Sequence, residues 1–324
     1  MLQLRIKQLI WSLTSPNLLT QWVTDDAQPF CYPINEDILT ELTRTLFLDD
    51  SITSLKNHNR LGKTFEQLIF FYLKHLSQSS PKPAITNLNH GVQIKTFGKH
   101  KRTLGEIDFL FHDSLNNQSI HLETAVKFYL ADVNQLEQLK EQKAWVGPNR
   151  KDRLDLKINK LFSHQLTLTK QQESEQTIKN LDFAAGKFRQ RYLVKGILYL
   201  PHWATKYSKE EINKHLPQAI NTNNEFGYWI AQSHLPQLLN NSCAARTLCR
   251  DEWLTVPVAQ DQLTEFNNRH RLDSNNKENL VTEIQQHFAT YARPIQIIIS
   301  TMDNPQNVKI SRYFIVADDW SATT

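Results

Sequence analysis

Glycine is scarce in this chain, with 8 residues among 324. The glycine-rich patterns GxxxxGK[ST] and GxGxxG, which bind nucleotide phosphates, are absent, and so is the GxSxG turn of serine hydrolases. The zinc-protease pattern HExxH does not occur either. These absences leave phosphate-loop, dinucleotide-binding, serine-hydrolase and zinc-protease functions without an anchoring motif.

Cysteine is also sparse, with 3 residues and no CxxC pattern. An odd number of cysteines cannot pair completely within one chain. Cys31, Cys243 and Cys249 are therefore interpreted as reduced thiols of a cytosolic protein. Two of them lie near His234, but their spacing matches zinc sites poorly, so we expect no zinc centre.

Long apolar runs are missing too. No stretch approaches the roughly 18 consecutive apolar residues that a membrane helix needs. The first segment, MLQLRIKQLIWSL, begins with apolar residues, but Arg5, Lys7 and Gln8 interrupt it. It also lacks the small-residue cleavage site of a secretory signal. We expect a soluble, cytoplasmic protein with no membrane partner.

The net charge is small, since 37 Lys and Arg residues face 33 Asp and Glu residues, for a formal charge of +4. Any surface for nucleic acid must therefore come from local basic patches. A hydrophobic content of 40% with 10% aromatic residues excludes a mainly disordered chain. The length suits one large domain or two ordinary ones.

Hydrophobic periodicity predicts a helix, three strands, a helix and a strand between residues 51 and 205. The segment RLGKTFEQLIFFYLKHL has apolar residues at steps of three and four, which is typical of a helix. Alternation predicts strands in GVQIKTFG, TLGEIDFLFHD and SIHLETAVKFYL, and an apolar run predicts another from Val194 to Leu200. Helices are also expected in 133–145 and in the polar stretch 145–169.

We therefore expect an α/β protein of the α+β type, with a mixed central sheet flanked by helices. Residues 1–50 are predicted to form an N-terminal helical extension. Residues 51–205 form the predicted core. Residues 206–324 combine helical pieces with strands, and we expect them to pack on or beside that core.

Acidic residues and a lysine fall on one face of two neighbouring predicted strands. GEIDFLF places Glu106 and Asp108 on one side, and HLETAVKFYL does the same for Glu123 and Lys127. Hydrolysis of a phosphodiester needs charge stabilisation at phosphorus and an activated water, which Mg²⁺ on a few carboxylates supplies. A nearby lysine orients the water or neutralises the transition state. The pattern favours a metal-dependent phosphodiesterase.

The order of elements and these residues resemble the PD-(D/E)XK nuclease superfamily, which has an αβββαβ core. More narrowly, RLGKTFE, GEIDFLF, HLETAVKFYL and WVGPNRKDRL resemble an uncharacterised bacterial family of unknown function. A fainter likeness to that family continues through YWIAQ, EWLTVPV and SRYFIVADDW. The superfamily resemblance covers about half of the chain. It implies an endo- or exonuclease that uses Mg²⁺ or Mn²⁺ and acts on DNA or structured RNA.

By position, the resemblance makes Asp108 the aspartate of the second strand and Lys127 the lysine of the third. Glu66, on the helix before the sheet, matches the acid that such enzymes often add to the metal shell. Glu123 takes the place of the second carboxylate, so the implied metal ligands are Asp108, Glu123 and Glu66, with Lys127 completing the catalytic set. Gln135 or Gln138 matches a further polar residue of some members.

Ala125 is the departure from the superfamily pattern, because the second carboxylate normally stands two residues before the lysine. Glu123 lies about 13 Å along the strand from Lys127 instead of about 6.6 Å, at a rise of about 3.3 Å per residue. The even offset keeps both side chains on one face, and a glutamate recovers several ångströms by leaning along the strand. The alternative is a catalytically inactive nuclease fold that binds nucleic acid or another protein.

Each of these residues also has a structural interpretation. Asp108 could face solvent opposite a basic residue, and Lys127 could be a cross-strand partner of Asp108 or Glu106. Glu123 could pair with Lys127 or His121. Glu66 could lie on the solvated stripe of an amphipathic helix. Glu106 is favoured as a surface charge, and His121 as a structural histidine.

Two basic segments are candidates for backbone contacts to nucleic acid, which position a duplex without reading its sequence. The first is KTFGKHKR and the second is the run 150–160. For the second run, a solvated helix face balanced by Asp152 and Asp155 is an equal alternative. The candidate residues are Lys99, Lys101, Arg102, Arg150, Lys151, Arg153 and Lys157.

Overall fold

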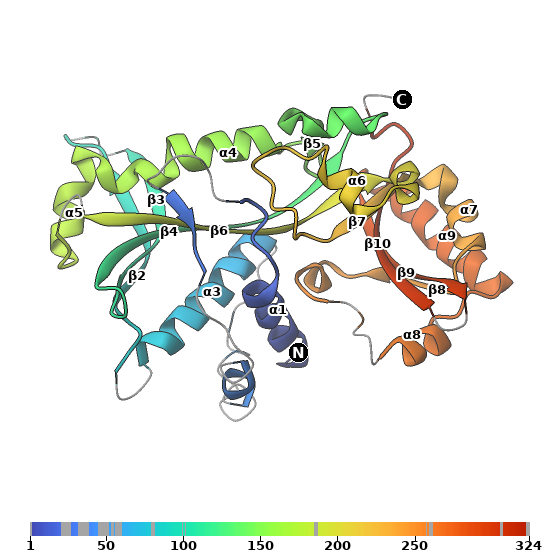
Figure 1. Ribbon diagram of the computed structural model, residues 1–324, viewed down its shortest axis with the longest axis horizontal. Coiled ribbons are helices and arrows are strands. Elements are labelled where there is room, and N and C mark those ends of the chain that lie inside the picture. Colours follow the sequence, from blue (N-terminus) through green and yellow to red (C-terminus); the bar gives the residue numbers. More distant parts are fainter. Residues whose placement is uncertain are drawn as a thin grey trace. The chain divides into compact units, whose positions relative to one another are not determined.

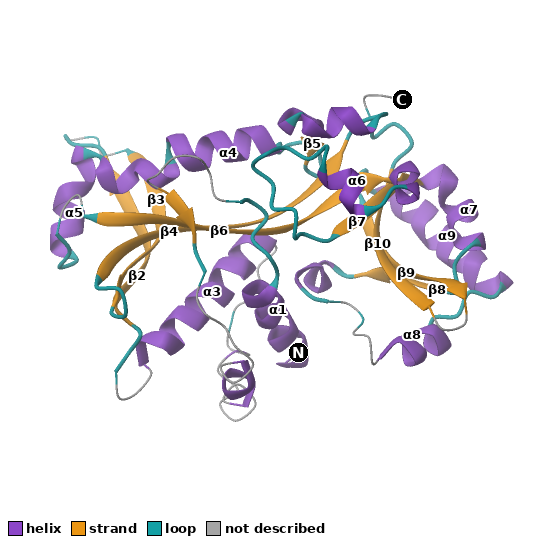
Figure 2. Ribbon diagram, viewed as in Figure 1, coloured by secondary structure: helices purple, strands orange, loops and turns teal. Residues whose placement is uncertain are grey.

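The computed structural model describes residues 2–20, 27–31, 39–44, 52, 55, 60–78, 82–98, 100, 102–184, 187–256, 258, 262–304 and 307–321. These residues form helices and a large mixed β-sheet, which confirms the expected α+β class (Figures 1 and 2). None of the helices within these ranges combines the length and apolar character needed to cross a membrane.

The chain divides into two compact units. Unit 1 comprises Met1–Lys127, Leu156–Gly196 and Ala219–Asn221, and unit 2 comprises Phe128–Asp155, Ile197–Gln218 and Thr222–Thr324. Strands β4 (Gln118–Ala131) and β6 (Phe188–Pro201) and helix α4 (Leu154–Ser163) have residues in both. The borders expected at residues 50 and 205 stay a prediction about independently folding domains.

Unit 1 contains the predicted order of helix, three strands, helix and strand. Its strands follow the order β2-β3-β4-β6, with β1 pairing in parallel with β6. The β2–β3 and β3–β4 pairs are antiparallel. Besides β4 and β6, the elements are α1 (Leu2–Thr14), β1 (Ala27–Pro29), α3 (Leu61–Gln78), β2 (Ile85–Lys95), β3 (Thr103–Asp113), α4 (Leu154–Ser163) and α5 (Glu175–Asn180).

Unit 2 has the strand order β6-β7-β10-β9-β8, with β5 pairing with the end of β4. The β6–β7 and β7–β10 pairs are parallel, whereas β9 is antiparallel to both of its neighbours. Leu238 of α7 and Ile284 of α9 pack with Ile297 and Ile299 of β9 in one apolar cluster. The elements are β5 (Trp145–Val146), α6 (Lys209–Asn213), β7 (Phe226–Ala231), α7 (Leu235–Asn240), β8 (Ala244–Leu248), α8 (Leu263–Arg269), α9 (Ser274–Thr290), β9 (Ile295–Asn304) and β10 (Asn307–Val316).

Helix α3 confirms the clearest helical prediction and sets the position of Glu66. Its apolar residues at steps of three and four, such as Phe65, Leu68 and Tyr72, are buried. Glu66 is 8% exposed, so it lies at the edge of this buried face and not on a solvated stripe. A carboxylate this deeply buried needs hydrogen-bonding or charged partners.

The strands next to the site are longer than the sequence patterns predict, except for β3, whose bounds match. Strand β6 begins at Phe188, six residues before Val194. Phe188, Gln190 and Tyr192 are buried while Arg189 is exposed, so the start of β6 alternates like a strand with one solvated face. The prediction followed only the continuous apolar run and missed this alternation.

The helix predicted for residues 133–145 is wrong. Two short 3₁₀ turns, Leu136–Lys140 and Gln142–Ala144, occupy this segment. The Gln138 side-chain oxygen accepts hydrogen bonds from the backbone N–H groups of Asn134 and Gln135, at 2.8 and 3.1 Å. A side chain that satisfies backbone donors in this way stabilises a turn in place of a longer helix.

Gly196 allows a close approach between β6 and β4. A Cβ atom at this position would lie 1.9 Å from the carbonyl oxygen of Lys127. Only glycine therefore allows β6 to pass so close to the residue that the sequence assigns as the catalytic lysine.

Replacing Gly196 by alanine is expected to destabilise unit 1. The strands must move apart, which we expect to cost about 1–3 kcal/mol of unfolding free energy, the usual range for overpacking. The matched control is Gly62→Ala in α3, where an added Cβ meets nothing within 4 Å and alanine favours the helix. Urea unfolding should give a lower midpoint for Gly196→Ala only. Equal midpoints for Gly196→Ala and the wild type would show that the close approach is not needed.

Candidate functional site

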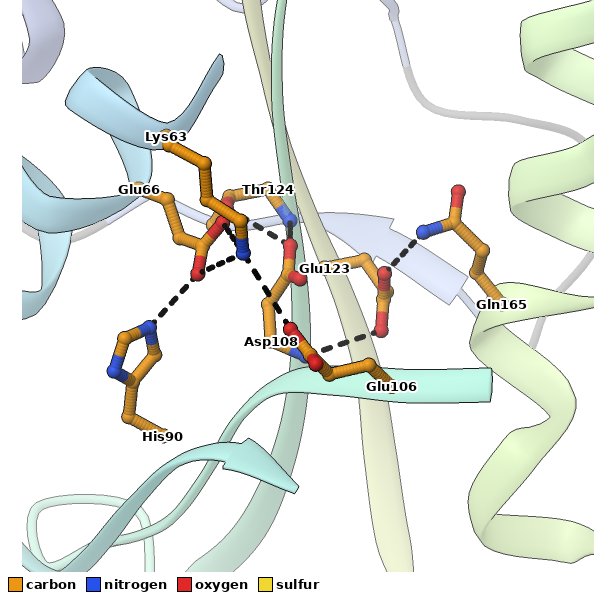
Figure 3. A network of polar contacts seen from close by, with 8 residues as sticks. All are labelled: Lys63, Glu66, His90, Glu106, Asp108, Glu123, Thr124 and Gln165. Carbon is orange, nitrogen blue, oxygen red and sulfur yellow. Dashed lines mark hydrogen bonds and ion pairs between the residues drawn. The ribbon is translucent and has the colours of Figure 1, made fainter. Parts of the chain in front are cut away.

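Three carboxylates converge in unit 1. Glu66 comes from α3, and Glu106 and Asp108 come from β3 (Figure 3). One oxygen atom from each lies within 4.8 Å of the others. Two oxygens on opposite sides of a Mg²⁺ ion are about 4.2 Å apart, since each bond is about 2.1 Å long. Neighbouring oxygens of an octahedral Mg²⁺ site are only about 3.0 Å apart, so the three side chains must draw closer together to share one ion.

Lys63 and His90 hold Glu66 in this cluster. The Lys63 Nζ atom lies 2.9 Å from Glu66 Oε2 and 3.4 Å from Glu106 Oε1, and His90 Nε2 lies 2.9 Å from Glu66 Oε1. Burial alone raises the pKa of Glu66, but the bonds to His90 and Lys63 outweigh it and the net shift is downward. Glu66 is therefore ionised, with the Lys63 ammonium bridging it to Glu106.

Asp108 is bonded to the next strand instead of to a cation. Its Oδ2 atom accepts hydrogen bonds from the backbone N–H and the hydroxyl of Thr124, at 2.7 and 3.0 Å. Burial, reinforced by the negative charge of Glu123, raises the pKa of Asp108 to about 7. A nearby positive charge would strongly stabilise the ionised form of a carboxylate in this environment.

Where the described backbone pairing of β3 and β4 ends, the carboxylates of Asp108 and Glu123 accept hydrogen bonds from backbone N–H groups of the neighbouring strand. The described register runs from the Phe109–Leu122 pair to the Asp113–Gln118 pair. Immediately beyond it, the Asp108 N–H donates to Glu123 Oε1 at 3.4 Å, and the Thr124 N–H donates to Asp108 Oδ2. Both acids are thereby fixed by backbone groups of the neighbouring strand.

Glu123 is buried in a hydrogen-bonded chain. It is 1% exposed, and its Oε1 atom lies 3.1 Å from His121 Nε2, whose Nδ1 atom lies 3.2 Å from the Thr169 hydroxyl. Gln165 donates to Glu123 Oε2 at 2.6 Å. Burial raises the pKa of Glu123 to about 7, against the opposing effect of Lys157. Burial lowers the pKa of His121 to about 3, so this ring is neutral and acts as a structural partner.

Two lysines contribute positive charge near the buried acids of the site. Lys157, from α4, donates from Nζ to Gln165 Oε1 at 3.0 Å. Burial lowers the pKa of Lys157 to about 8, and the positive charge of Lys127 adds to this effect, while Glu123 and Asp108 oppose it. Lys157 therefore lies within electrostatic reach of both Lys127 and the two buried acids.

The structure brings together Glu66 and Asp108 as the sequence predicts. It adds Glu106, which sequence reasoning favoured as a surface charge and whose side chain is 39% exposed. Glu123 is not among the three described acids whose oxygens come within 4.8 Å of one another, although it touches the Asp108 backbone. Its role as a metal ligand stays a prediction.

Sequence reasoning missed Lys63, His90 and Gln165. Lys63 stands one helical turn before Glu66, a spacing that predicts a side-chain pair. His90 pairs in register with Phe109, next to Asp108, so the strand alignment would have indicated it. Gln165 follows α4 and carries no pattern that points to Glu123.

The predicted basic contacts of unit 1 are only partly described. Lys99 and Lys101 lie outside the described residues. Arg102 is exposed, with its backbone N–H bonded to the Thr96 hydroxyl. Lys157 lies within the acidic site, as described above.

In unit 2, Arg150 donates to Asp132 at 2.8 Å and stacks over the Trp320 ring at 5.1 Å. Arg153 forms two 2.7 Å bonds with Asp155, and Lys151 is exposed. The two arginines thus have acidic partners within the chain. Contacts of these residues with nucleic acid stay a prediction.

Comparison with known proteins places the chain in a family. The family model described as "Domain of unknown function (DUF1853)" matches residues 7–316. No curated protein and no solved structure matches the chain.

The raised pKa of Asp108 predicts a specific pH dependence of stability in metal-free buffer. Between about pH 4 and 7 the folded state binds more protons at this group than the unfolded state does, so its contribution to stability falls as the pH rises. Because asparagine does not titrate, Asp108→Asn removes this decrease in unfolding free energy. Relative to the wild type, the variant should gain unfolding free energy across this window, with an upper limit of about 4 kcal/mol at about 1.4 kcal/mol per pKa unit.

Urea unfolding at several pH values measures this difference. Asp182→Asn is the matched control, because Asp182 is exposed at φ 59°, a conformation that asparagine tolerates. Any pH dependence that Asp182→Asn shares with Asp108→Asn is the general effect of removing one carboxylate. A pH-independent difference for Asp108→Asn would contradict the account of its burial.

Proposed function

We propose that this chain, which belongs to the DUF1853 family, is a metal-dependent phosphodiesterase that hydrolyses DNA or structured RNA. The convergence of Glu66, Glu106 and Asp108 beside two lysines carries the proposal. The element order α3-β2-β3-β4-α4-β6 supports a PD-(D/E)XK-like core. Strongly shifted acids and a shifted lysine in one place are typical of functional sites.

The donor atoms of the cluster fit Mg²⁺ or Mn²⁺. All three ligands are carboxylate oxygens, and such ions use few carboxylates and keep several waters. Asp108, Glu66 and Glu106 would hold the ion, which, when bound, stabilises charge at the phosphorus and makes water a stronger acid. Glu123, bonded to the Asp108 amide, is the alternative third ligand.

The chain's own residues then supply the remaining roles. Lys127 positions or activates the attacking water, or neutralises the transition state. Lys157 keeps its charge beside Glu123 and adds to the positive potential at the site. The bonds from His121 and Gln165 orient the Glu123 carboxylate. The exposed Arg102 and Lys151 are the candidate contacts to the nucleic-acid backbone.

A second function has a specific observation in its favour. Ala125 stands where the superfamily keeps a carboxylate, and the Lys63 ammonium already bridges Glu66 and Glu106. A lysine that satisfies two acids removes part of their need for a metal ion. The same fold would then serve as a nucleic-acid-binding or protein-interaction module without catalysis.

Nuclease activity is the first test. Purified protein with Mg²⁺ or Mn²⁺ should cleave DNA or structured RNA, and Asp108→Asn should lower the rate by at least about 10- to 100-fold, the loss that follows even when a group supporting a metal site is removed. Glu175→Gln, at an exposed position of α5, should retain the wild-type rate. Cleavage by Asp108→Asn at the wild-type rate would contradict the assignment, and absence of cleavage by any form would favour the binding module.

Calorimetric titration with Mn²⁺ separates the two candidate ligand sets. If Glu106 is the third ligand, Glu106→Gln should weaken binding about 10-fold or more, while Glu123→Gln should change it much less. The reverse order would establish Glu123 as the displaced carboxylate. Equal affinity of the wild type, both variants and Asp108→Asn would place the ion elsewhere.

A further inference from the structure

A second candidate site lies in unit 2. It is a cavity of about 910 Å³ lined by residues from the end of β6, from β7, α7, β9 and β10. Cavities that bind small molecules have about 300–1,000 Å³, so this one is large enough for a ligand with several rings. None of its lining residues belongs to the carboxylate cluster.

Aromatic rings form much of the wall. Trp203, Tyr228 and Trp229 line the cavity and are half-buried, while Tyr313 is 3% exposed beneath them. The Tyr228 and Tyr313 ring centroids are 5.5 Å apart. The Trp229 indole donates to the backbone oxygen of Ala131 at 2.8 Å, which fixes its ring. Half-buried aromatic rings on a cavity wall suit stacking against a flat, aromatic ligand.

Polar groups that can form hydrogen bonds with the edge of such a ligand also line the cavity. His202 Nδ1 lies 3.0 Å from the Tyr313 hydroxyl, and burial together with His234 lowers the pKa of His202, so its ring is neutral at pH 7. The exposed amides of Gln237 and Asn241 line the cavity from α7 and the residue after it. Amides and a neutral imidazole both donate and accept hydrogen bonds.

A positively charged side chain is part of the described lining. Lys309 of β10 lines the cavity and is exposed, and the described residues that line it include no Asp or Glu. The chain as a whole has almost as many acids as bases. The positive charge of Lys309 at this wall favours a ligand that carries negative charge.

We propose that this cavity binds a nucleotide, with the base stacked on the aromatic wall and the phosphate near Lys309. Flat shape, polar edges and a negative charge occur together in this class of ligand. The nucleotide is either free or part of a single-stranded nucleic acid, where stacking on aromatic side chains is the usual mode of binding. The inference is independent of the metal site, and it assigns the cavity a binding role and no chemistry.

Binding is tested on the whole chain in EDTA, so that metal-dependent cleavage plays no part. Calorimetry with AMP, CMP, GMP and UMP should give saturable binding to one site. Oligonucleotides of about six residues distinguish the sources: tighter binding than the mononucleotides identifies a strand, and equal binding identifies a free nucleotide. No saturable binding of any of them at millimolar concentration would overturn the proposal.

Variants locate the site. Trp203→Ala should weaken binding at least about 5-fold, the lower limit for loss of one stacked ring, and Trp203→Phe should restore most of it. Lys309→Met should weaken the binding of AMP but not the binding of adenosine. Lys214→Met, at an exposed lysine that does not line the cavity, should change neither affinity. Wild-type affinity of both Trp203→Ala and Lys309→Met for AMP would also overturn the proposal.

Discussion

The exchange of bonds between β3 and β4 at Asp108 and Glu123 is the constraint on which the candidate site depends. Where the described pairing of these strands ends, each carboxylate accepts a hydrogen bond from the backbone of the opposite strand. The two acids are thereby held beside each other within the sheet. Glu66, Glu106 and Lys157 then lie around a pair whose position the backbone determines.

This arrangement has an energetic cost that a cation would relieve. Asp108 and Glu123 are buried next to each other, and burial raises the pKa of both to about 7. A protein chain rarely keeps two such groups together for stability alone, because removing water from a carboxylate without a full charge partner is unfavourable. Lys63 already pairs with both Glu66 and Glu106, whereas Asp108 has only Thr124 as a hydrogen-bond donor to its carboxylate among the described bonds. We therefore expect a bound cation to stabilise the ionised form of Asp108 more than that of the other acids.

Much of the site's framework could be predicted from the sequence. Periodicity identified α3, β3 and β4, and the face shared by Asp108, Glu123 and Lys127 followed from strand alternation. The contribution of Glu106 and His90 could not be predicted, because it depends on the register of β2 against β3 and on where α3 lies on the sheet. The position of Gln165 depends on how the chain continues after α4. Residues 133–145 show a different limit, since a single capping side chain there outweighs helical periodicity.

Anomalous diffraction from crystals containing Mn²⁺ tests the central claim most directly. The account predicts one strong anomalous peak within bonding distance of Asp108 and Glu66, with either Glu106 or Glu123 as the third carboxylate, and with the Lys63 ammonium displaced. A peak at another part of the chain, or none at this cluster in Mn²⁺ well above millimolar concentration, would contradict it.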